Sequence, residues 1–171
     1  MIKLIQAEST EQIENVRTLF REYESWLGLD LCFQGFEEEL AGLPGKYFAP
    51  DGRLYLAVID EKQAGCIALR KLEDGICEIK RLFVREDFRG LGIGKIMIEK
   101  LIYEARSVGY VLMRLDTHLP KMEKAVRLYE SHGFLEIPAY YDNPHTGVLF
   151  MEMRLAENQI EKNRGDPRSA K

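Results

Sequence analysis

The segment EIKRLFVREDFRGLGIGKIMIEKL (residues 78–101) decides the fold of this chain. It begins as an apolar strand pattern, passes through charged residues, and reaches an amphipathic helix by way of RGLGIG. A glycine inside or beside a helix costs roughly 0.5–1 kcal/mol relative to alanine. Three glycines at alternate positions just before a helix therefore indicate that something requires bare backbone there.

Two familiar phosphate-binding motifs do not fit these glycines. A phosphate loop of the GxxxxGK[ST] type needs a glycine at position 89 and a hydroxyl at position 96, where this chain has Arg89 and Ile96. The dinucleotide fingerprint GxGxxG needs a glycine at position 95, where this chain has Lys95. The chain therefore lacks both motifs.

A third interpretation keeps the physics without either motif. Successive backbone N–H groups at the beginning of a helix form a concave anion site, which the helix dipole strengthens. Gly90, Gly92 and Gly94 would leave room for a pyrophosphate, and Arg89 and Lys95 would flank it with positive charge. The alternative is a plain turn, but a tight turn needs only one or two glycines. We therefore favour a pyrophosphate site.

The rest of the chain alternates strand and helix patterns around this segment. Apolar periodicity predicts strands over residues 1–7, 53–60, 63–72, 75–84, 110–117, 134–137 and 147–155. It predicts helices over residues 10–27, 36–43, 95–109 and 120–134. This order indicates a single mixed α/β domain over residues 1–155, followed by a polar tail over residues 156–171 that we expect to be disordered.

Composition and charge exclude several classes of function. The chain has 171 residues, 30% of them charged, and a net charge of −4, which argues against a nucleic-acid surface. Because its beginning turns acidic early and no apolar run approaches membrane-spanning length, we expect a cytoplasmic protein without a membrane partner. Cys32, Cys66 and Cys77 lack the spacing of a metal site, so we expect buried thiols and no metal; a reactive cysteine is the less favoured alternative.

Two motifs together resemble one known family. Residues 89–94 (RGLGIG), placed after a strand, resemble motif A of the GNAT superfamily of N-acetyltransferases, the R/Q-x-x-G-x-G/A loop. Residues 125–134 (AVRLYESHGF) resemble motif B of the same superfamily, an A-x-x-L-Y helix that ends in G-F. The resemblance extends from about residue 2 to residue 155. It implies a central mixed sheet of six to seven strands with about four flanking helices, in which strands 4 and 5 splay apart.

The resemblance also implies the acyl donor. In this family motif A holds the pyrophosphate of acetyl-CoA, and the pantetheine arm pairs with the backbone of strand 4. Carried onto this chain, the donor-binding residues are Leu82, Phe83, Val84, Arg89, Gly90, Leu91, Gly92, Ile93, Gly94, Lys95 and Tyr129. Many members have an asparagine three residues before the motif B alanine; here that position is Met122, and Thr117 or Lys121 would have to compensate. Whether an acyl group other than acetyl is used stays open.

The chemistry implied by the resemblance is direct transfer of acetyl from the thioester to an amine. Tyr129 lies where the family places the acid that protonates the leaving thiolate, although an aromatic core residue is the plainer alternative. Glu78, near the start of strand 4, is the first candidate for the base; an exposed strand carboxylate is its alternative. Asp116, at the end of strand 5, is the second candidate, and a bound water is the third.

The acceptor side of the resembled fold comes from the first two helices and the loop before the last strand. We expect Trp26, Tyr140, Tyr141 and Asn143 to contact the acceptor, although turn and core roles would also explain them. The long loop after Ile137 would cover an open groove, which favours a small-molecule amine. A protein or peptide acetyltransferase is the alternative, and a non-catalytic acyl-CoA-binding module is a more remote one. A homodimer is the oligomeric state left open.

Overall fold

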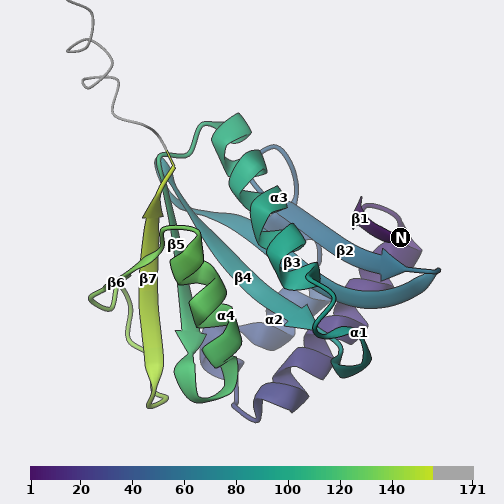
Figure 1. Cartoon of the computed structure of the whole chain (residues 1–171), viewed down its shortest axis with the longest axis horizontal. Helices are drawn as coiled ribbons and strands as arrows, with labels where there is room; N and C mark the ends of the chain where they lie inside the picture. Colours follow the sequence, from purple (N-terminus) through teal and green to yellow (C-terminus); the bar gives the residue numbers. More distant parts are fainter. Residues whose placement is uncertain (156–171) are drawn as a thin grey trace, which may run out of the picture.

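The computed structural model describes residues 1–155 and consists of one twisted sheet between two layers of helices (Figure 1). The strands are β1 (Ile2–Gln6), β2 (Arg53–Ile59), β3 (Lys62–Glu73), β4 (Ile76–Val84), β5 (Leu112–His118), β6 (Leu135–Ile137) and β7 (Val148–Arg154). The α-helices are α1 (Thr10–Leu27), α2 (Phe36–Ala41), α3 (Ile93–Val108) and α4 (Leu119–Ser131). The expected mixed α/β class, with seven strands and four α-helices, is confirmed for these residues.

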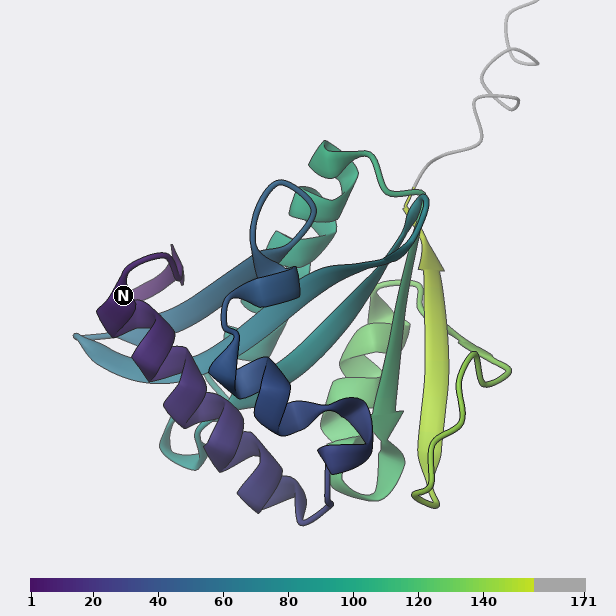
Figure 2. The same ribbon diagram turned by 180° about the vertical axis from the view of Figure 1, so that it is seen from behind.

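Helices cover both faces of the sheet. Helices α3 and α4 lie on the face seen in Figure 1, and α1 and α2 lie on the opposite face, seen in Figure 2. Alternate residues of β2 serve the two layers: Tyr55 and Ala57 belong to the core under α3, whereas Leu54 and Leu56 belong to the core under α1. Because both faces are buried, the central strands have nearly continuous apolar sequences.

The sheet splits in its middle. Its strand order is β1-β2-β3-β4-β5-β7-β6, and β4–β5 is the parallel pair in an otherwise antiparallel sheet. Strands β4 and β5 pair through Ile76–Glu78 and Leu112–Arg114, and beyond these residues they separate. The expected splay between strands 4 and 5 is therefore present, and it opens toward the ends of both strands.

A bulge accompanies the split. Arg81 in β4 has a φ of 58°, a left-handed conformation that residues other than glycine rarely adopt. The register between β3 and β4 shifts at the same place, between Cys66 and Ala68. A bulge of this kind bends a strand and changes the direction of its side chains. It lies where β4 leaves β5.

Several helix boundaries differ from the expected ones by one to three residues. Helix α1 begins and ends where expected, because Ser9 and Gln12 form a capping box and Gly28 ends the helix in a left-handed conformation. Helix α3 begins at Ile93, so that it includes the last glycine of the loop. Helix α4 is interrupted at Met122, whose backbone is not helical. The tail expected over residues 156–171 lies outside the described residues.

Candidate active site

The glycine loop opens the beginning of helix α3 to solvent. Gly90 and Gly92 have φ angles of 82° and 79°, which side-chain-bearing residues rarely adopt. Gly92 caps α3 without any side-chain hydrogen bond, so the first N–H groups of the helix have no side-chain cap. A Cβ added at Gly90 or Gly92 would meet no atom within 4 Å. The positive end of α3 therefore faces open space, as an anion site requires.

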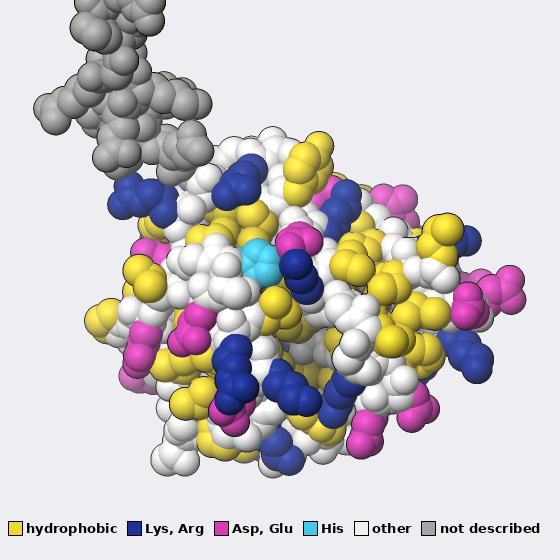
Figure 3. Space-filling view, viewed as in Figure 1, with side chains coloured by type: hydrophobic (Ala, Val, Ile, Leu, Met, Phe, Trp, Pro, Cys, Tyr) yellow, Lys and Arg dark blue, Asp and Glu magenta, His cyan; other side chains and the backbone are white. Residues whose placement is uncertain are grey.

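A groove of about 670 Å³ lies against this loop; we call it the glycine-loop groove. Figure 3 shows Lys and Arg side chains gathered around a hollow on this face of the molecule. The donor-binding residues expected from the sequence that line the groove are Leu82, Phe83, Val84, Arg89, Gly90, Gly92, Ile93, Gly94 and Lys95. Leu91 is exposed beside it and is not part of the lining.

Trp26 lies in the same groove and not on the acceptor side expected from the sequence. The Arg89 guanidinium lies 4.8 Å from the centre of its ring, and the Lys121 ammonium lies 5.9 Å from it. Two cations against one aromatic ring bring positive charge from the glycine loop and from α4 to the same edge of the groove.

A second hollow lies on the opposite side of the split. This cavity, of about 610 Å³, is bounded by the 3-10 helices η1 (Cys32–Gln34) and η2 (Gly45–Tyr47), by α2, and by residues of β3 and β4; we call it the α2-side cavity. Arg70, Lys80, Arg81 and Tyr141 line it.

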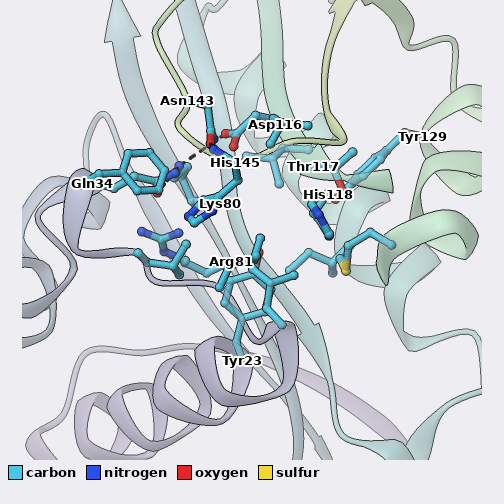
Figure 4. Close-up of a pocket in the computed structure, with 18 residues that line it drawn as sticks. Tyr23, Gln34, Lys80, Arg81, Asp116, Thr117, His118, Tyr129, Asn143 and His145 are labelled. Carbon is cyan, nitrogen blue, oxygen red and sulfur yellow. Dashed lines mark hydrogen bonds and ion pairs between the residues drawn. The ribbon is translucent and has the colours of Figure 1, made fainter. Parts of the chain in front are cut away.

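A small cavity of about 40 Å³ lies between the two hollows (Figure 4). It shares Leu82 and Met122 with the glycine-loop groove, and Lys80 and Arg81 with the α2-side cavity. The split between β4 and β5 thus gives a passage through the sheet, with a wide hollow on each side and a narrow point in the middle.

Tyr129 reaches the narrow point from α4. Its side chain is buried, it packs edge-on against Phe134 at 5.5 Å, and its hydroxyl makes no hydrogen bond to any residue between 1 and 155. Burial raises the pKa of Tyr129 well above its ordinary value, so the phenol stays protonated at neutral pH. It is therefore a proton donor without a competing acceptor.

Two further polar atoms at the narrow point have no partner. The Thr117 hydroxyl and His118 Nδ1 are buried without a hydrogen bond in the described part of the chain, and both residues line the small cavity. Buried polar groups are usually hydrogen-bonded, so these two atoms are available to a bound molecule or water.

The two candidate carboxylates occupy different places. Glu78 is completely buried and is not part of the lining of the three cavities. It accepts hydrogen bonds from Arg70 Nε at 2.9 Å and from the Tyr140 hydroxyl at 2.6 Å. Asp116 lines the small cavity, where it accepts a hydrogen bond from the Tyr141 hydroxyl at 2.7 Å. Asp116 is thus the carboxylate at the narrow point, and Glu78 lies behind it.

Lys80 connects the two carboxylates. Its ammonium lies 3.8 Å from Glu78 and 3.5 Å from Asp116, and it donates a hydrogen bond to Gln34 at 3.1 Å. The side chain is 9% exposed, so its charge is balanced mainly by these two neighbours. Lys80 is therefore the cation that both carboxylates share.

The tyrosines and the asparagine expected to contact an acceptor hold this network together. Burial and then the neighbouring Glu78 raise the pKa of Tyr140, and burial and then Asp116 raise that of Tyr141, so both stay hydroxyl donors. Asn143 donates to the Tyr141 oxygen at 3.0 Å and lines the small cavity. Of the three, Tyr141 and Asn143 face a cavity, whereas Tyr140 faces Glu78.

Sequence reasoning missed the cations of this site. Arg70, Lys80 and Arg81 were not among the expected site residues, although all three line the α2-side cavity. A signal was present: Lys80 and Arg81 follow Glu78 within the strand EIKRLFV, and adjacent charges in a buried strand need partners.

Known proteins are similar in sequence to most of this chain. The model of the acetyltransferase (GNAT) family matches residues 13–134. An uncharacterized N-acetyltransferase of Dictyostelium discoideum is 34% identical over 91% of this chain and 99% of its own length. The N-acetylaspartate synthetase of Danio rerio is 29% identical over 72% of this chain, which spans 46% of that longer protein.

Solved structures share the fold at low sequence identity. A GNAT-family acetyltransferase of Staphylococcus aureus superposes with a TM-score of 0.75 at 22% identity, covering 91% of this chain and all (100%) of that one. The ribosomal-protein-S18-alanine N-acetyltransferase of Escherichia coli gives 0.68 at 17% identity, covering 92% and 96%. The PaiA N-acetyltransferase of Thermoplasma acidophilum, in complex with coenzyme A, gives 0.68 at 19% identity, covering 90% and 99%.

None of the helices between residues 1 and 155 is long and apolar enough to cross a bilayer. No group of three or more His, Cys, Asp or Glu side chains in the same residues could hold a metal ion.

Proposed function

The chain belongs to the acetyltransferase (GNAT) family and is an acyltransferase, and we propose that it transfers acetyl from acetyl-CoA directly to the primary amine of a small molecule. The observation that carries this proposal is the passage through the split sheet. It has a pyrophosphate-type groove on one side, a charged cavity on the other, and a protonated tyrosine with a carboxylate between them.

The glycine-loop groove fits the acyl donor that this family uses. Open space in front of Gly90 and Gly92 and uncapped N–H groups at α3 suit a pyrophosphate, while Arg89 and Lys95 add positive charge. After Glu78 β4 no longer pairs with β5, so the backbone of Leu82, Phe83 and Val84 along the groove would hold the pantetheine amides. Acetyl-CoA supplies an activated thioester at the narrow point.

Proton transfer requires one acid and one base at the narrow point. Tyr129 would protonate the departing thiolate, which its unpartnered hydroxyl supports. We propose Asp116 as the base, because it lines the small cavity, and we assign Glu78 the role of positioning Tyr140 and Lys80. Direct proton removal by Glu78 stays the alternative.

The acceptor side favours a small amine over a polypeptide. The loop between β6 and β7 is tied to the region after α1: His145 contacts the Asp30 carbonyl at 2.8 Å, and Gln34 donates to Tyr141 at 3.3 Å. These contacts narrow the mouth that a peptide would need. A relative named N-acetylaspartate synthetase supports a small acceptor, whereas the ribosomal-protein enzyme of the same fold keeps a protein acceptor as the second candidate.

The proposal is tested in two steps that use the whole chain. Trp26 is the single tryptophan and lies in the glycine-loop groove, so acetyl-CoA should change its fluorescence and raise the melting temperature, whereas NAD or ATP should not. A panel of amines with acetyl-CoA should then release free thiol. Equal stabilisation by NAD or ATP would contradict the donor site, and acetylation of peptides but not of small amines would favour the second candidate. A cytoplasmic location and a homodimer stay predictions.

A further inference from the structure

The α2-side cavity contains an arginine side chain whose guanidinium group is hydrogen-bonded on one side only. Arg70 on β3 donates through Nε to Glu78, at 2.9 Å. Its two terminal nitrogens have no hydrogen-bond partner among residues 1–155, and its side chain, 26% exposed, lines the cavity. Burial alone would lower the pKa of Arg70, but Glu78 raises it overall, so the group stays charged. The free end of the guanidinium therefore faces the cavity with a full positive charge.

Two further cations line the same cavity. Arg81 uses Nε and one terminal nitrogen to hold Glu39, at 3.0 and 3.4 Å, and its other terminal nitrogen is unpaired in the described residues. Lys46, in η2, is exposed at the rim and forms no ion pair within the described part of the chain. Positive groups thus reach the cavity from its floor and from its rim.

The carboxylates that face these cations are nearly all engaged. Glu39 is held by Arg81 and by the Tyr47 hydroxyl. Glu78 and Asp116 are not part of the lining of this cavity. They are held by Lys80 and by the hydroxyls of Tyr140 and Tyr141. Glu38 and Asp142 also line the cavity, but both are exposed side chains. No carboxylate among residues 1–155 occupies the free end of Arg70.

A planar guanidinium edge matches a carboxylate in two parallel hydrogen bonds, and Arg is preferred over Lys for this purpose. An acceptor with an amide in the same place would leave charged donors poorly paired, which is costly in a partly buried site. The small cavity, with Asp116 and Tyr129, borders the same cavity through Lys80 and Arg81. An amine bound there would have its remaining groups close to Arg70.

We propose that the acceptor is an amine that also carries a carboxylate, and that the free end of Arg70, assisted by Lys46, binds this carboxylate in the α2-side cavity. The proposal rests on the proposed acetyl transfer and adds the chemical class of its acceptor. Arg70 is then a specificity-determining residue, because it distinguishes an acid from its neutral analogue.

The first test is calorimetric binding to the full chain saturated with coenzyme A. The probes are three matched pairs that differ by one carboxylate: aspartate and asparagine, glutamate and glutamine, and glycine and glycinamide. At least one acid should bind ten times more tightly than its amide, or better. Acids that bind no better than their amides, or that fail to bind at all, would overturn the proposal.

Single substitutions test which side chain causes the preference for the acid over its amide. Arg70→Lys keeps the charge beside Glu78 but loses the fork, and should reduce the acid-to-amide preference by about ten-fold. Lys46→Gln, at the exposed rim, should reduce it by about two-fold to five-fold. Lys71→Gln is the matched control, because the neighbouring Lys71 is exposed, pairs with Asp74 and is not part of the cavity lining. An unchanged preference in Arg70→Lys, or an equal loss in Lys71→Gln, would contradict the assignment.

The two proposals fail in different ways. If coenzyme A does not bind, the proposed function fails. If coenzyme A binds and amines are acetylated without any preference for acids, only the carboxylate site fails. The variants should all bind coenzyme A as tightly as the natural sequence does, because none of the three side chains lines the glycine-loop groove.

Discussion

The glycine-loop groove and the α2-side cavity meet at one narrow point, yet they are built in opposite ways. The groove is formed by the segments 82–95 and 120–128 together with Trp26, and the anion site that we propose in it consists of backbone N–H groups at the beginning of α3. The cavity is formed by side chains that range from Cys32 to Asp142 along the chain, and its floor consists of buried charges. One region uses local backbone, and the other uses distant side chains.

This difference has consequences for how each region tolerates change. Backbone donors present the same atoms whatever the neighbouring side chains are, so the groove can remain constant while the chain around it varies. Buried charges depend on each partner, so a change at one of them disturbs the others. We therefore expect substitutions in the groove to alter donor affinity without changing acceptor choice, and substitutions in the cavity to alter stability and acceptor choice together.

The largest effect is expected at the narrow point, where both regions meet. Tyr129→Phe removes the unpartnered hydroxyl but keeps the buried ring, so kcat should fall by ~10²–10⁴-fold while coenzyme A affinity stays the same. Steady-state kinetics and fluorescence titration measure the two quantities.

Tyr23→Phe is the matched control for that change. Tyr23 also lines the small cavity, and burial raises its pKa to about 12. A larger loss of kcat in Tyr23→Phe than in Tyr129→Phe would assign the acid to Tyr23.

The next effect tests whether the groove depends on bare backbone. Gly92→Val places a branched side chain in a left-handed conformation in front of α3, so affinity for acetyl-CoA should fall by about 100-fold or more. The strain should also lower the free energy of unfolding by about 1–2 kcal/mol. Fluorescence titration and thermal melting follow the two effects.

Gly109→Val separates strain from binding. Gly109 is left-handed as well, with a φ of 104°, but it caps the far end of the same helix. It should cost similar stability and leave acetyl-CoA binding intact. Loss of binding in both variants would mean that the groove responds to the stability of α3 and not to its glycines.

A smaller effect distinguishes the carboxylates Glu78 and Asp116. Glu78→Gln removes the buried charge that Arg70 and Lys80 share, so the free energy of unfolding should fall by about 2 kcal/mol. The shape of its pH–rate profile should not change. Urea unfolding and rates between acidic and alkaline pH measure these outcomes.

Asp116→Asn, in contrast, should change the shape of the pH–rate profile. Without the carboxylate that we propose as the base, the enzyme relies on free amine, which is scarce at acidic and neutral pH and accumulates as pH rises, so the rate defect should shrink at high pH. If the shrinking defect occurs in Glu78→Gln instead, Glu78 is the base.

The smallest effect concerns the pH dependence of stability at helix α3. It should leave binding in the glycine-loop groove and in the α2-side cavity unchanged. Glu104 on α3 accepts from Arg53 at 2.8 Å and from the Tyr55 hydroxyl at 2.9 Å. Burial opposes its ionisation, but Lys100, Arg53 and Tyr55 together lower its pKa from 4.5 to about 2. A depressed carboxylate pKa contributes stability above pH 4.5 that is lost as pH falls toward 2.

Glu104→Gln should therefore flatten the acid side of the stability curve in that window, with a loss of about 1 kcal/mol at neutral pH. Acetyl-CoA affinity and acceptor preference should stay unchanged. Thermal melting across the pH range checks this, and a variant with the same acid sensitivity as the natural sequence would contradict it.

The comparison also explains which expectations from the sequence were accurate. The glycine loop, the caps of α1 and the order of strands and helices are local features, and the structure confirms them within one to three residues. The hydrogen bonds of Tyr140 and Tyr141 were not predicted: their hydroxyls donate to Glu78 and Asp116, which lie 62 and 25 residues away in the chain. Pairings of this length leave no periodic signal in a sequence.

The sequence by itself determined the element order, the family and the glycine loop before α3, because each depends on residues within a few turns of one another. Only the tertiary structure decided that Asp116 faces the narrow point while Glu78 is buried behind it, and that Arg70 has a free end. The physical reason is that the role of a buried charge depends on the groups that surround it. The bulge at Arg81 and the split of β4 from β5 determine which groups those are, because they bring distant strands, helices and a loop to one place.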